Sequence, residues 1–327
     1  MTNDFTKLVD LAQPRLGAKV VYATDDFFAD KARLISPAEP VFIPDKYDEH
    51  GKWMDGWESR RKRTPGHDWC VVKLGKPGRI AGVEIDTRHF TGNYPPAASV
   101  EVCNCGDETP GEGQAWAPLV ERTDLKGDDR KFIAVNSDSV WTHVRLNIFP
   151  DGGVARLRVY GAIDIDWSRV SADEVIDLAA MEWGGRGLGA NDEHFGRVAN
   201  MIAPGRGANM GDGWETRRRR EPGHDWAVLK LGHPGVIEKI IVDTAHFKGN
   251  YPDRCFIQGT GEAMSDEEAL AQAENWPVIL PEQKLEADRE HVFVSEIAKH
   301  EPVRFVRLNI IPDGGVSRLR LFGKVVQ

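Results

Sequence analysis

Two segments of the chain are nearly identical: DGWESRRKRTPGHDWCVVKLGKPG at residues 55–78, and DGWETRRRREPGHDWAVLKLGHPG at residues 212–235. They belong to a longer alignment without gaps, in which residues 55–95 match residues 212–252 and 27 of 41 positions are identical. Internal similarity at this level indicates that one structural unit has been duplicated within the chain.

The similarity continues outward on both sides of this block. RLNIFPDGGVARLR at 145–158 recurs as RLNIIPDGGVSRLR at 307–320, and LVDLA at 8–12 recurs as VIDLA at 175–179. The offset between the copies is 167 at the start, 157 in the main block and 162 at the end. The first copy therefore has ten extra residues before Asp55, and the second has five extra residues between its two main blocks.

Each copy is about 160 residues long, whereas solenoid repeats are about 20–50 residues long. We therefore expect two domains, residues 1–167 and 168–327. Each copy contains short segments that are rich in β-branched and aromatic residues and bounded by Gly, Pro, Asn or Asp; in the first copy they are WCVVKLG, RIAGVEIDT, ASVEVCN, KFIAVN, THVRLNIF and RLRVYGA. Six to eight such strands in each copy, without interleaved helices, predict an all-β protein in which each copy is an antiparallel β-sandwich or a jelly roll.

Two capping boxes predict short helical insertions in this β framework. Ser171-Ala-Asp-Glu174 predicts a helix that continues through Met181, and Ser265-Asp-Glu-Glu268 predicts an acidic helix in the second copy.

Composition excludes several classes of protein. The chain has 327 residues, is 41% hydrophobic and 28% charged, and has a net charge of -9, which is typical of a soluble globular protein. An acidic chain is a poor match for a nucleic-acid binder, which needs a concentrated basic surface. No apolar run reaches the roughly 18 residues of a membrane span. The first residues, MTNDFTKLVDLAQPRL, lack a basic segment followed by an apolar one, so we expect a cytoplasmic protein.

The polar residues shared by both copies are the candidates for a functional site. In the first copy they form four clusters: Glu58/Arg60/Arg61, His67/Asp68, Asp86/His89/Asn93/Tyr94, and Asp151/Arg156. In the second copy the equivalent clusters are Glu215/Arg217/Arg218, His224/Asp225, Asp243/His246/Asn250/Tyr251, and Asp313/Arg318.

Each cluster also has a purely structural interpretation. A guanidinium at Arg60 or Arg61 could bind a carboxylate with two parallel hydrogen bonds, or could form a surface ion pair. His67 could act as a general acid or base, because imidazole titrates near neutral pH, or could only bind backbone groups. The loop that carries His89 and Asn93 could contact an amide-rich ligand or simply be well ordered. Asp86 with His89 could bind a divalent ion, but two such residues do not make a metal site.

Taken together, DGWESRRKR, GHDW, DTRHFTGNYPP and RLNIFPDGGVARLRVYG resemble the allantoicase family, and the resemblance covers nearly the whole chain. It implies two jelly-roll repeats related to galactose-binding-like domains. It also implies hydrolysis of allantoate to ureidoglycolate and urea in purine degradation. The second copy departs from the first at the early element, where ANDEHF at 190–195 stands in place of ATDDFF at 23–28.

On this basis the carboxylate and two ureido groups of allantoate suggest roles for the shared residues. We expect substrate binding by Arg and by the polar loop, at Arg60, Arg61, Asn93, Tyr94, Arg217, Arg218, Asn250 and Tyr251. We expect acid–base work by His with neighbouring carboxylates, at His67, Asp68, His89, Glu58, His224, Asp225, His246 and Glu215. The residues contain no clear metal-ligand motif, so a divalent metal stays open, as does a homo-oligomer.

Two other interpretations remain at this stage. The chain could be a tandem module that binds a small ligand or a carbohydrate without catalysis, because many β-sandwiches do so. Alternatively, the second copy could be a scaffold that supports a single active copy.

Overall fold

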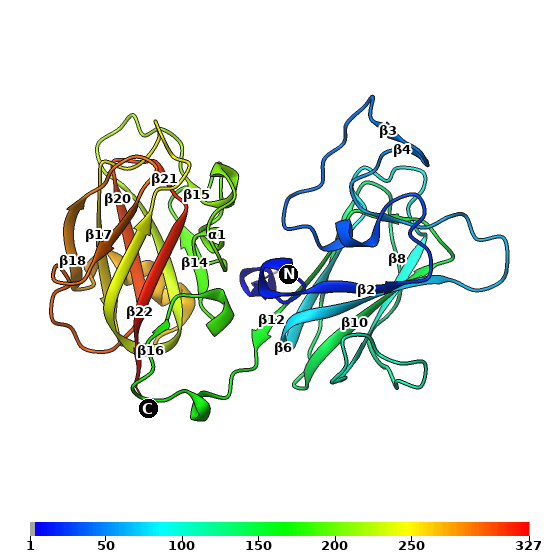
Figure 1. The fold of residues 1–327 in the computed structure, drawn as a ribbon, viewed down its shortest axis with the longest axis horizontal. Coiled ribbons are helices and arrows are strands. Elements are labelled where there is room, and N and C mark those ends of the chain that lie inside the picture. Colours follow the sequence, from blue (N-terminus) through cyan, green and yellow to red (C-terminus); the bar gives the residue numbers. More distant parts are fainter. Residues whose placement is uncertain (1–3, 327) are drawn as a thin grey trace. The chain divides into compact units, whose positions relative to one another are not determined.

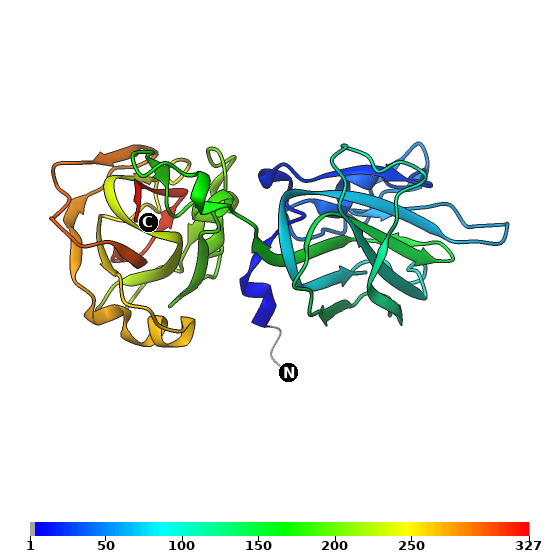
Figure 2. The same ribbon diagram turned by 90° about the horizontal axis from the view of Figure 1, so that it is seen from below.

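The computed structural model describes residues 4–326 and divides into two compact units, Met1–Asp164 and Ile165–Gln327. The division falls three residues before the predicted domain boundary. Each unit is built mainly of antiparallel strands (Figures 1 and 2).

The first unit is a β-sandwich with short 3-10 turns. Its turns are η1 (Asp4–Lys7), η2 (Pro14–Leu16) and η3 (Lys31–Ile35). Its strands are β1 (Val9–Asp10), β2 (Lys19–Ala23), β3 (Tyr47–Asp48), β4 (Gly51–Lys52), β5 (Trp57–Glu58), β6 (Asp68–Asp86), β7 (Ala97–Cys103), β8 (Ala117–Asp124), β9 (Arg130–Ala134), β10 (Val140–Phe149), β11 (Gly153–Val154) and β12 (Arg156–Ile163).

The long strand β6 belongs to both layers of this sandwich. Its first half pairs with β2 and β10, and β10 continues to β7 and β8. Its second half pairs with β12 and β9, and β12 continues to β1. All of these pairs are antiparallel, so one strand joins two sheets whose facing sides form the core.

The second unit repeats this design around β16. Its strands are β13 (Ile176–Asp177), β14 (Arg186–Ala190), β15 (Trp214–Glu215), β16 (Asp225–Asp243), β17 (Arg254–Thr260), β18 (Val278–Lys284), β19 (Glu290–Phe293), β20 (Val303–Ile311), β21 (Gly315–Val316) and β22 (Arg318–Val325). Its helices and 3-10 turns are η4 (Trp167–Arg169), η5 (Met181–Trp183), α1 (Val198–Met201), η6 (Met210–Asp212), α2 (Asp266–Gln272) and η7 (Ala273–Asn275). The predicted all-β fold of two tandem sandwiches is confirmed.

Alternation along the central strands decides which side chains face the core. In β20, Leu308 and Ile310 are fully buried in the main hydrophobic cluster. Asn309, between them, points to the opposite face of the sheet, because successive side chains of a strand alternate. In β10, Leu146 and Ile148 are buried in the same way, so Asn147 lies on the outer face of the first unit's sheet.

The two capping boxes have different outcomes. Ser265 caps α2, with the reciprocal hydrogen bonds to Glu268 in place, so that prediction is confirmed. The helix expected from Ser171 through Met181 is wrong. Ile176 and Asp177 instead form β13, which pairs with Gly323 and Phe322 of β22. Pairing with the sheet and burial of the apolar residues here outweigh a local capping preference.

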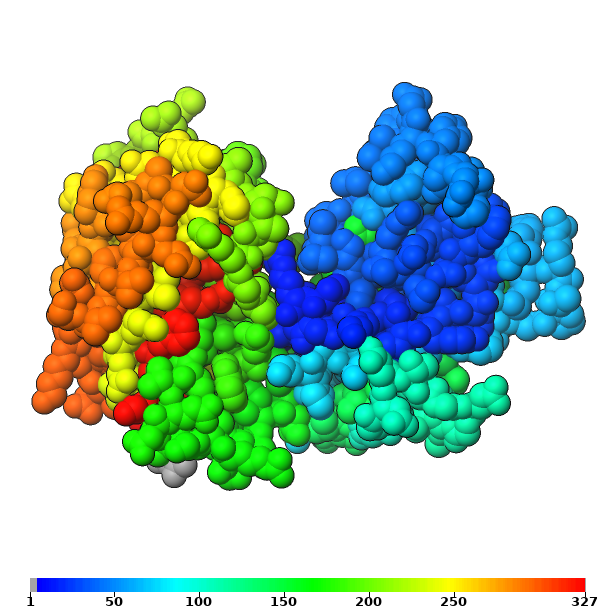
Figure 3. Space-filling model, viewed as in Figure 1, coloured from blue at the N-terminus to red at the C-terminus, as the bar shows by residue number. Residues whose placement is uncertain are grey.

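The extra residues of the first copy form a projecting segment between two anchor points. Arg156 is 1% exposed, and its guanidinium donates to the carbonyl of Ala38 at 2.9 Å and to the carboxylate of Asp55 at 2.8 Å. Arg318 makes the equivalent bonds to Gly205 and Asp212, both at 3.0 Å. The segment between Ala38 and Asp55 carries β3 and β4 and stands away from the sheets of its own unit (Figures 1 and 3).

None of the helices within residues 4–326 combines the length and the apolar character required to cross a membrane.

Candidate functional site

A carboxyl–amide pair lies at the loop end of each sandwich. Glu58 in β5 is opposite Gly153 of β11, and the Gly153 N–H donates to the carbonyl of Asn93 at 2.7 Å. The side-chain amide of Asn93 in turn donates to Glu58 Oε1 at 2.7 Å. The second unit repeats this arrangement, since Asn250 donates to Glu215 and accepts from Gly315 at 2.8 Å.

Both carboxyl groups are half-buried, and this changes their acidity. Burial raises the pKa of Glu58 above its ordinary value, although the hydrogen bond from Asn93 acts in the opposite direction. Burial likewise raises the pKa of Glu215 above its ordinary value, and the hydrogen bond from Asn250 acts in the opposite direction. A carboxyl group with a raised pKa keeps its proton closer to neutral pH, which is what a general acid needs.

The arginines next to these carboxyl groups differ in their freedom. Arg60 is held by Asp25, which accepts from Arg60 Nε at 2.7 Å and also from the Arg60 backbone N–H at 3.0 Å. Burial would raise the pKa of Asp25, but its hydrogen bonds from Arg60 and Phe27 lower it below its ordinary value. Arg61 is exposed and has no hydrogen-bond or ion-pair partner within residues 4–326.

The second unit distributes its arginines in the same way. Arg217 Nε donates to Asp192 at 2.8 Å, and hydrogen bonds from Arg217 and from the backbone lower the pKa of Asp192 against the effect of burial. Arg218 is exposed and, in the described part of the chain, has no such partner. One guanidinium per unit is thus fixed, and the next one along the chain is available to a ligand.

Asp68 and Asp225 are buried and paired. Lys62 Nζ donates to Asp68 at 2.6 Å, and Thr24 adds a hydrogen bond at 2.9 Å. In the second unit Arg219 and Asn191 bind Asp225, both at 2.8 Å. A carboxylate held by a cation and a second donor is well suited to orienting its neighbours.

His67 and His224 lie on the outer face of their sheets. His67 Nε2 is 3.1 Å from Asn147 Oδ1, and its ring lies against Phe149, with 4.6 Å between ring centroids. His224 Nε2 is 3.0 Å from Asn309 Oδ1, and Phe256 contacts its ring edge-on at 5.4 Å. Among the described residues, no hydrogen bond connects either ring to Glu58 or Glu215.

His89 and His246 hold the loop that precedes β5 and β15. His89 Nε2 lies 3.1 Å from the carbonyl of Pro40, and His246 Nε2 lies 2.7 Å from the carbonyl of Gly207. Both residues adopt positive φ, 71° and 72°, a conformation that is uncommon for residues other than glycine. These contacts favour a structural role, and the predicted acid–base role of these two histidines stays a prediction.

The aromatic candidates also belong to the packing of the loop. Tyr94 packs against the small cluster of Met54, Phe90 and Ala155, while Tyr251 is half-buried in the second unit. Their predicted contact with substrate stays a prediction.

Sequence reasoning did not single out the partners that organise these groups. Asp25, Thr24 and Lys62 in the first unit correspond to Asp192, Asn191 and Arg219 in the second. Identity between the copies was the available signal for Asp25, because it is the same residue type as Asp192 at an offset of 167. The other two positions change type between the copies, so a search for shared residues passes over them.

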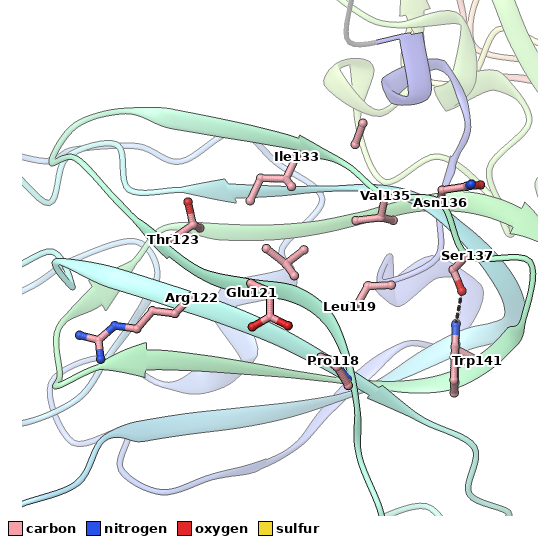
Figure 4. A pocket seen from close by; sticks show the side chains of 12 residues that line it. Pro118, Leu119, Glu121, Arg122, Thr123, Ile133, Val135, Asn136, Ser137 and Trp141 are labelled. Carbon is pink, nitrogen blue, oxygen red and sulfur yellow. Dashed lines mark hydrogen bonds between the residues drawn. The ribbon is translucent and has the colours of Figure 1, made fainter.

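A pocket of about 610 Å³ lies elsewhere in the first unit, between β8 and the segment that begins in β9 (Figure 4). Leu119, Ile133 and Val135 supply apolar walls, and Trp141 donates to Ser137 Oγ at 2.8 Å at one end. None of the candidate residues lines this pocket. Within residues 4–326, no group of three or more His, Cys, Asp or Glu side chains is arranged to hold a metal ion.

The fold and these loops define a duplicated β-sandwich protein with a carboxyl–amide pair and an unpaired guanidinium in each copy. The family model described as "Allantoicase repeat" matches residues 9–164 and 176–326. The chain therefore belongs to the allantoicase family.

Relatives and solved structures agree with this assignment. The chain is 57% identical to "Probable allantoicase 1" of Burkholderia mallei, over 98% of this chain and 96% of the relative. It is similar to the crystal structure of allantoicase from Saccharomyces cerevisiae, with a TM-score of 0.79 and 39% identity, over 97% of this chain and 93% of that one. A second solved allantoicase structure has a TM-score of 0.83 at 38% identity, with the same coverage.

Proposed function

We propose that the protein is an allantoicase, which hydrolyses allantoate to ureidoglycolate and urea. The observation behind the proposal is the pair of Glu58 with Asn93, together with an unpaired Arg61 three residues further along the chain, repeated as Glu215, Asn250 and Arg218. Membership of the family supports the choice of substrate.

The unpaired arginines bind the substrate carboxylate. A guanidinium presents two parallel N–H groups that match the two oxygens of a carboxylate, and it keeps its charge at any working pH. Arg60 cannot serve as freely in this role, because Asp25 already occupies its donors. The oxygen and amide groups of Asn93 are suited to the N–H and C=O groups of a ureido arm.

Glu58 delivers the proton that the leaving group needs. Hydrolysis breaks the bond between the central carbon and one ureido nitrogen, and that nitrogen must gain a proton to depart as urea. The raised pKa of Glu58 keeps the carboxyl group protonated closer to neutral pH than that of an exposed Glu. His67 is the base that takes a proton from the attacking water, because Asp68 is committed to Lys62.

The proposal is tested by incubating the purified protein with allantoate and measuring urea, with and without a chelator. We expect urea release from the unaltered protein. The matched control is the double variant Glu58→Gln/Glu215→Gln, which retains the hydrogen-bond acceptor for Asn93 but cannot carry the proton. Binding of allantoate without urea above background in either condition, also after divalent metal is added, would reject hydrolysis and favour a binding module.

A further inference from the structure

The hydrogen bonds around His67 and His224 determine which ring nitrogen carries the proton. Each Nε2 lies within hydrogen-bond distance of an asparagine Oδ1, at 3.1 Å for Asn147 and 3.0 Å for Asn309. Both asparagines are buried, with 4% and 0% exposure. The orientation of each buried amide can be deduced from the groups on its other side.

In the first unit a carboxylate fixes the amide. Asn147 Nδ2 lies 2.8 Å from Glu101 Oε2 and 3.2 Å from Ser99 Oγ. Arg145 holds the same carboxylate through Nε at 2.7 Å. An ionised carboxylate can only accept, so the NH₂ group of Asn147 must face it and the oxygen must face His67. His67 therefore donates from Nε2, and its Nδ1 carries the lone pair.

In the second unit backbone carbonyls fix the amide through an intermediate glutamine. Gln258 Nε2 donates to the carbonyls of Glu274 and Trp276, at 2.9 and 2.8 Å. Its Oε1 therefore faces Asn309 Nδ2, at 3.1 Å. The oxygen of Asn309 must then face His224, which donates from Nε2 as His67 does.

The two units reach this result with different side chains. Glu101 is opposite Arg145 in the sheet, and Gln258 is opposite Arg307 in the equivalent register. Ser99 and Phe256 likewise occupy equivalent positions, opposite Asn147 and Asn309. The charge, size and hydrogen-bonding capacity of the supporting residues differ, yet the arrangement of protons on the histidine is the same.

We propose that Asn147 and Asn309 are positioning residues, which hold His67 and His224 in the Nε2–H tautomer so that Nδ1 accepts the proton of the attacking water. This inference rests on the proposed hydrolysis and specifies it further. The water oxygen bonds to the central carbon, its proton moves to Nδ1, the carbon–nitrogen bond breaks, and the proton of the Glu58 carboxyl moves to the departing urea nitrogen. Solvent then removes the proton from the imidazolium and returns one to the carboxylate.

The double substitution Glu101→Lys/Arg145→Leu reverses the first relay. An ammonium group can only donate, so the oxygen of Asn147 must face the new lysine and its NH₂ then points at His67 Nε2. His67 can accept there only in the Nδ1–H tautomer, so the lone pair moves away from Nδ1. Glu101→Gln alone preserves the relay, because Arg145 Nε and Asn147 Nδ2 donate to the same oxygen, Glu101 Oε2, and a glutamine oxygen in its place accepts from both.

Nitrogen NMR of ¹⁵N-histidine protein at about pH 8.5, two units above the ordinary imidazole pKa, distinguishes the tautomers directly. We expect the protonated nitrogen of His67 to change from Nε2 to Nδ1 in Glu101→Lys/Arg145→Leu and to stay at Nε2 in Glu101→Gln. His224 is the internal reference and should not change. Ser99→Ala is the matched control, because it removes the other acceptor of Asn147 and leaves the Glu101 carboxylate in place.

Turnover is then measured in chains that also carry His224→Ala, which leaves catalysis to the first unit. We expect Glu101→Lys/Arg145→Leu to lower kcat by about 100-fold or more with little change in KM, because a general base contributes typically 10²–10⁴-fold. The kcat of the Ser99→Ala variant should stay within about two-fold of the kcat of the chain that carries His224→Ala alone.

Three results would overturn the inference. In the first, His67 keeps its Nε2–H tautomer in Glu101→Lys/Arg145→Leu. In the second, the tautomer changes while kcat does not. In the third, His224→Ala alone abolishes urea release. The absence of urea from the unaltered protein would instead reject the proposed function, and the NMR result would still test the relay.

Discussion

At the scale of single residues, Glu58 and Glu215 link stability to acidity. Their pKa values are raised by burial, so the folded protein holds these protons more tightly than the unfolded chain does. Between the unfolded and the folded pKa the native state binds more protons. Stability therefore falls as the pH rises through this window, and the loss persists at higher pH.

The double variant Glu58→Gln/Glu215→Gln separates the loss of stability on ionisation of these carboxyl groups from their role in catalysis. Glutamine does not ionise, so thermal unfolding at about pH 8 should show a Tm equal to or above that of the unaltered protein. In the same protein kcat for urea release should fall by about 10²–10⁴-fold. Retention of full turnover would remove these carboxyl groups from the proposed mechanism.

Arg61 and Arg218 give a complementary prediction about binding. Loss of a charge-assisted hydrogen bond costs about 1.5–3 kcal/mol, so Arg61→Ala/Arg218→Ala should raise KM for allantoate roughly 10- to 100-fold. The Tm should hardly change, because both side chains are exposed and form no ion pair in the described structure. Arg63→Ala, on the same loop, is the control, and an equal rise in KM there would indicate only a general charge effect.

At the scale of elements, the Pro-Asp-Gly-Gly turns hold the carboxyl–amide pairs in place. A Cβ atom at Gly153 would collide with the ring of the buried Phe90, and a Cβ atom at Gly315 would collide with Phe247. These turns therefore require glycine for the close approach of the aromatic ring. The same glycines bond to the carbonyls of Asn93 and Asn250.

Gly153→Ala should consequently lower the free energy of unfolding by about 1–3 kcal/mol, because the ring or the turn must move. Urea denaturation is the appropriate measurement, since the midpoint shifts at an unchanged slope if only stability changes. Gly92→Ala is the control, as no atom outside its chain neighbours lies within 4 Å of the added carbon. Equal effects at both positions would contradict the steric explanation.

The elements also show what could be predicted from the sequence and what could not. The strands around β6 and β16 were predictable because β-branched residues and glycine-bounded turns are local signals. The capping box at Ser265 was correct, but the one at Ser171 failed because β13 pairs with a strand about 145 residues away. The relay from Asn147 to Glu101 was missed for the same reason, since it joins neighbouring strands that are distant in sequence.

The candidate site was predictable only where the two copies agree. Glu58, Asn93 and the arginines were found because they are identical in both copies. Lys62, Thr24, Glu101 and Ser99 differ from their counterparts, and their importance depends on contacts rather than on identity. The separation of His67 from Asp68 onto opposite faces follows from strand alternation.

At the scale of the whole molecule, each unit has its own core and its own copy of the carboxyl–amide pair. We therefore expect Glu58→Gln and Glu215→Gln, made separately, each to leave about half of the turnover per chain, and the double variant to lose it. The measurement is kcat from urea release at saturating allantoate. If one single variant loses all activity while the other retains it, the unit whose substitution has no effect is a scaffold.

The buried arginines Arg156 and Arg318 have a practical consequence for the whole chain. Each guanidinium forms hydrogen bonds with the polypeptide at both ends of a surface loop, where the loop leaves the sandwich and where it returns. The loop between these two hydrogen-bonded positions has 16 residues in the first unit, 39–54, and six in the second, 206–211. A loop whose two ends are held by hydrogen bonds can change in length and sequence while the β-sandwich keeps its structure. These two loops are therefore suitable insertion sites, at which new peptide segments can be added next to the loop end of either sandwich.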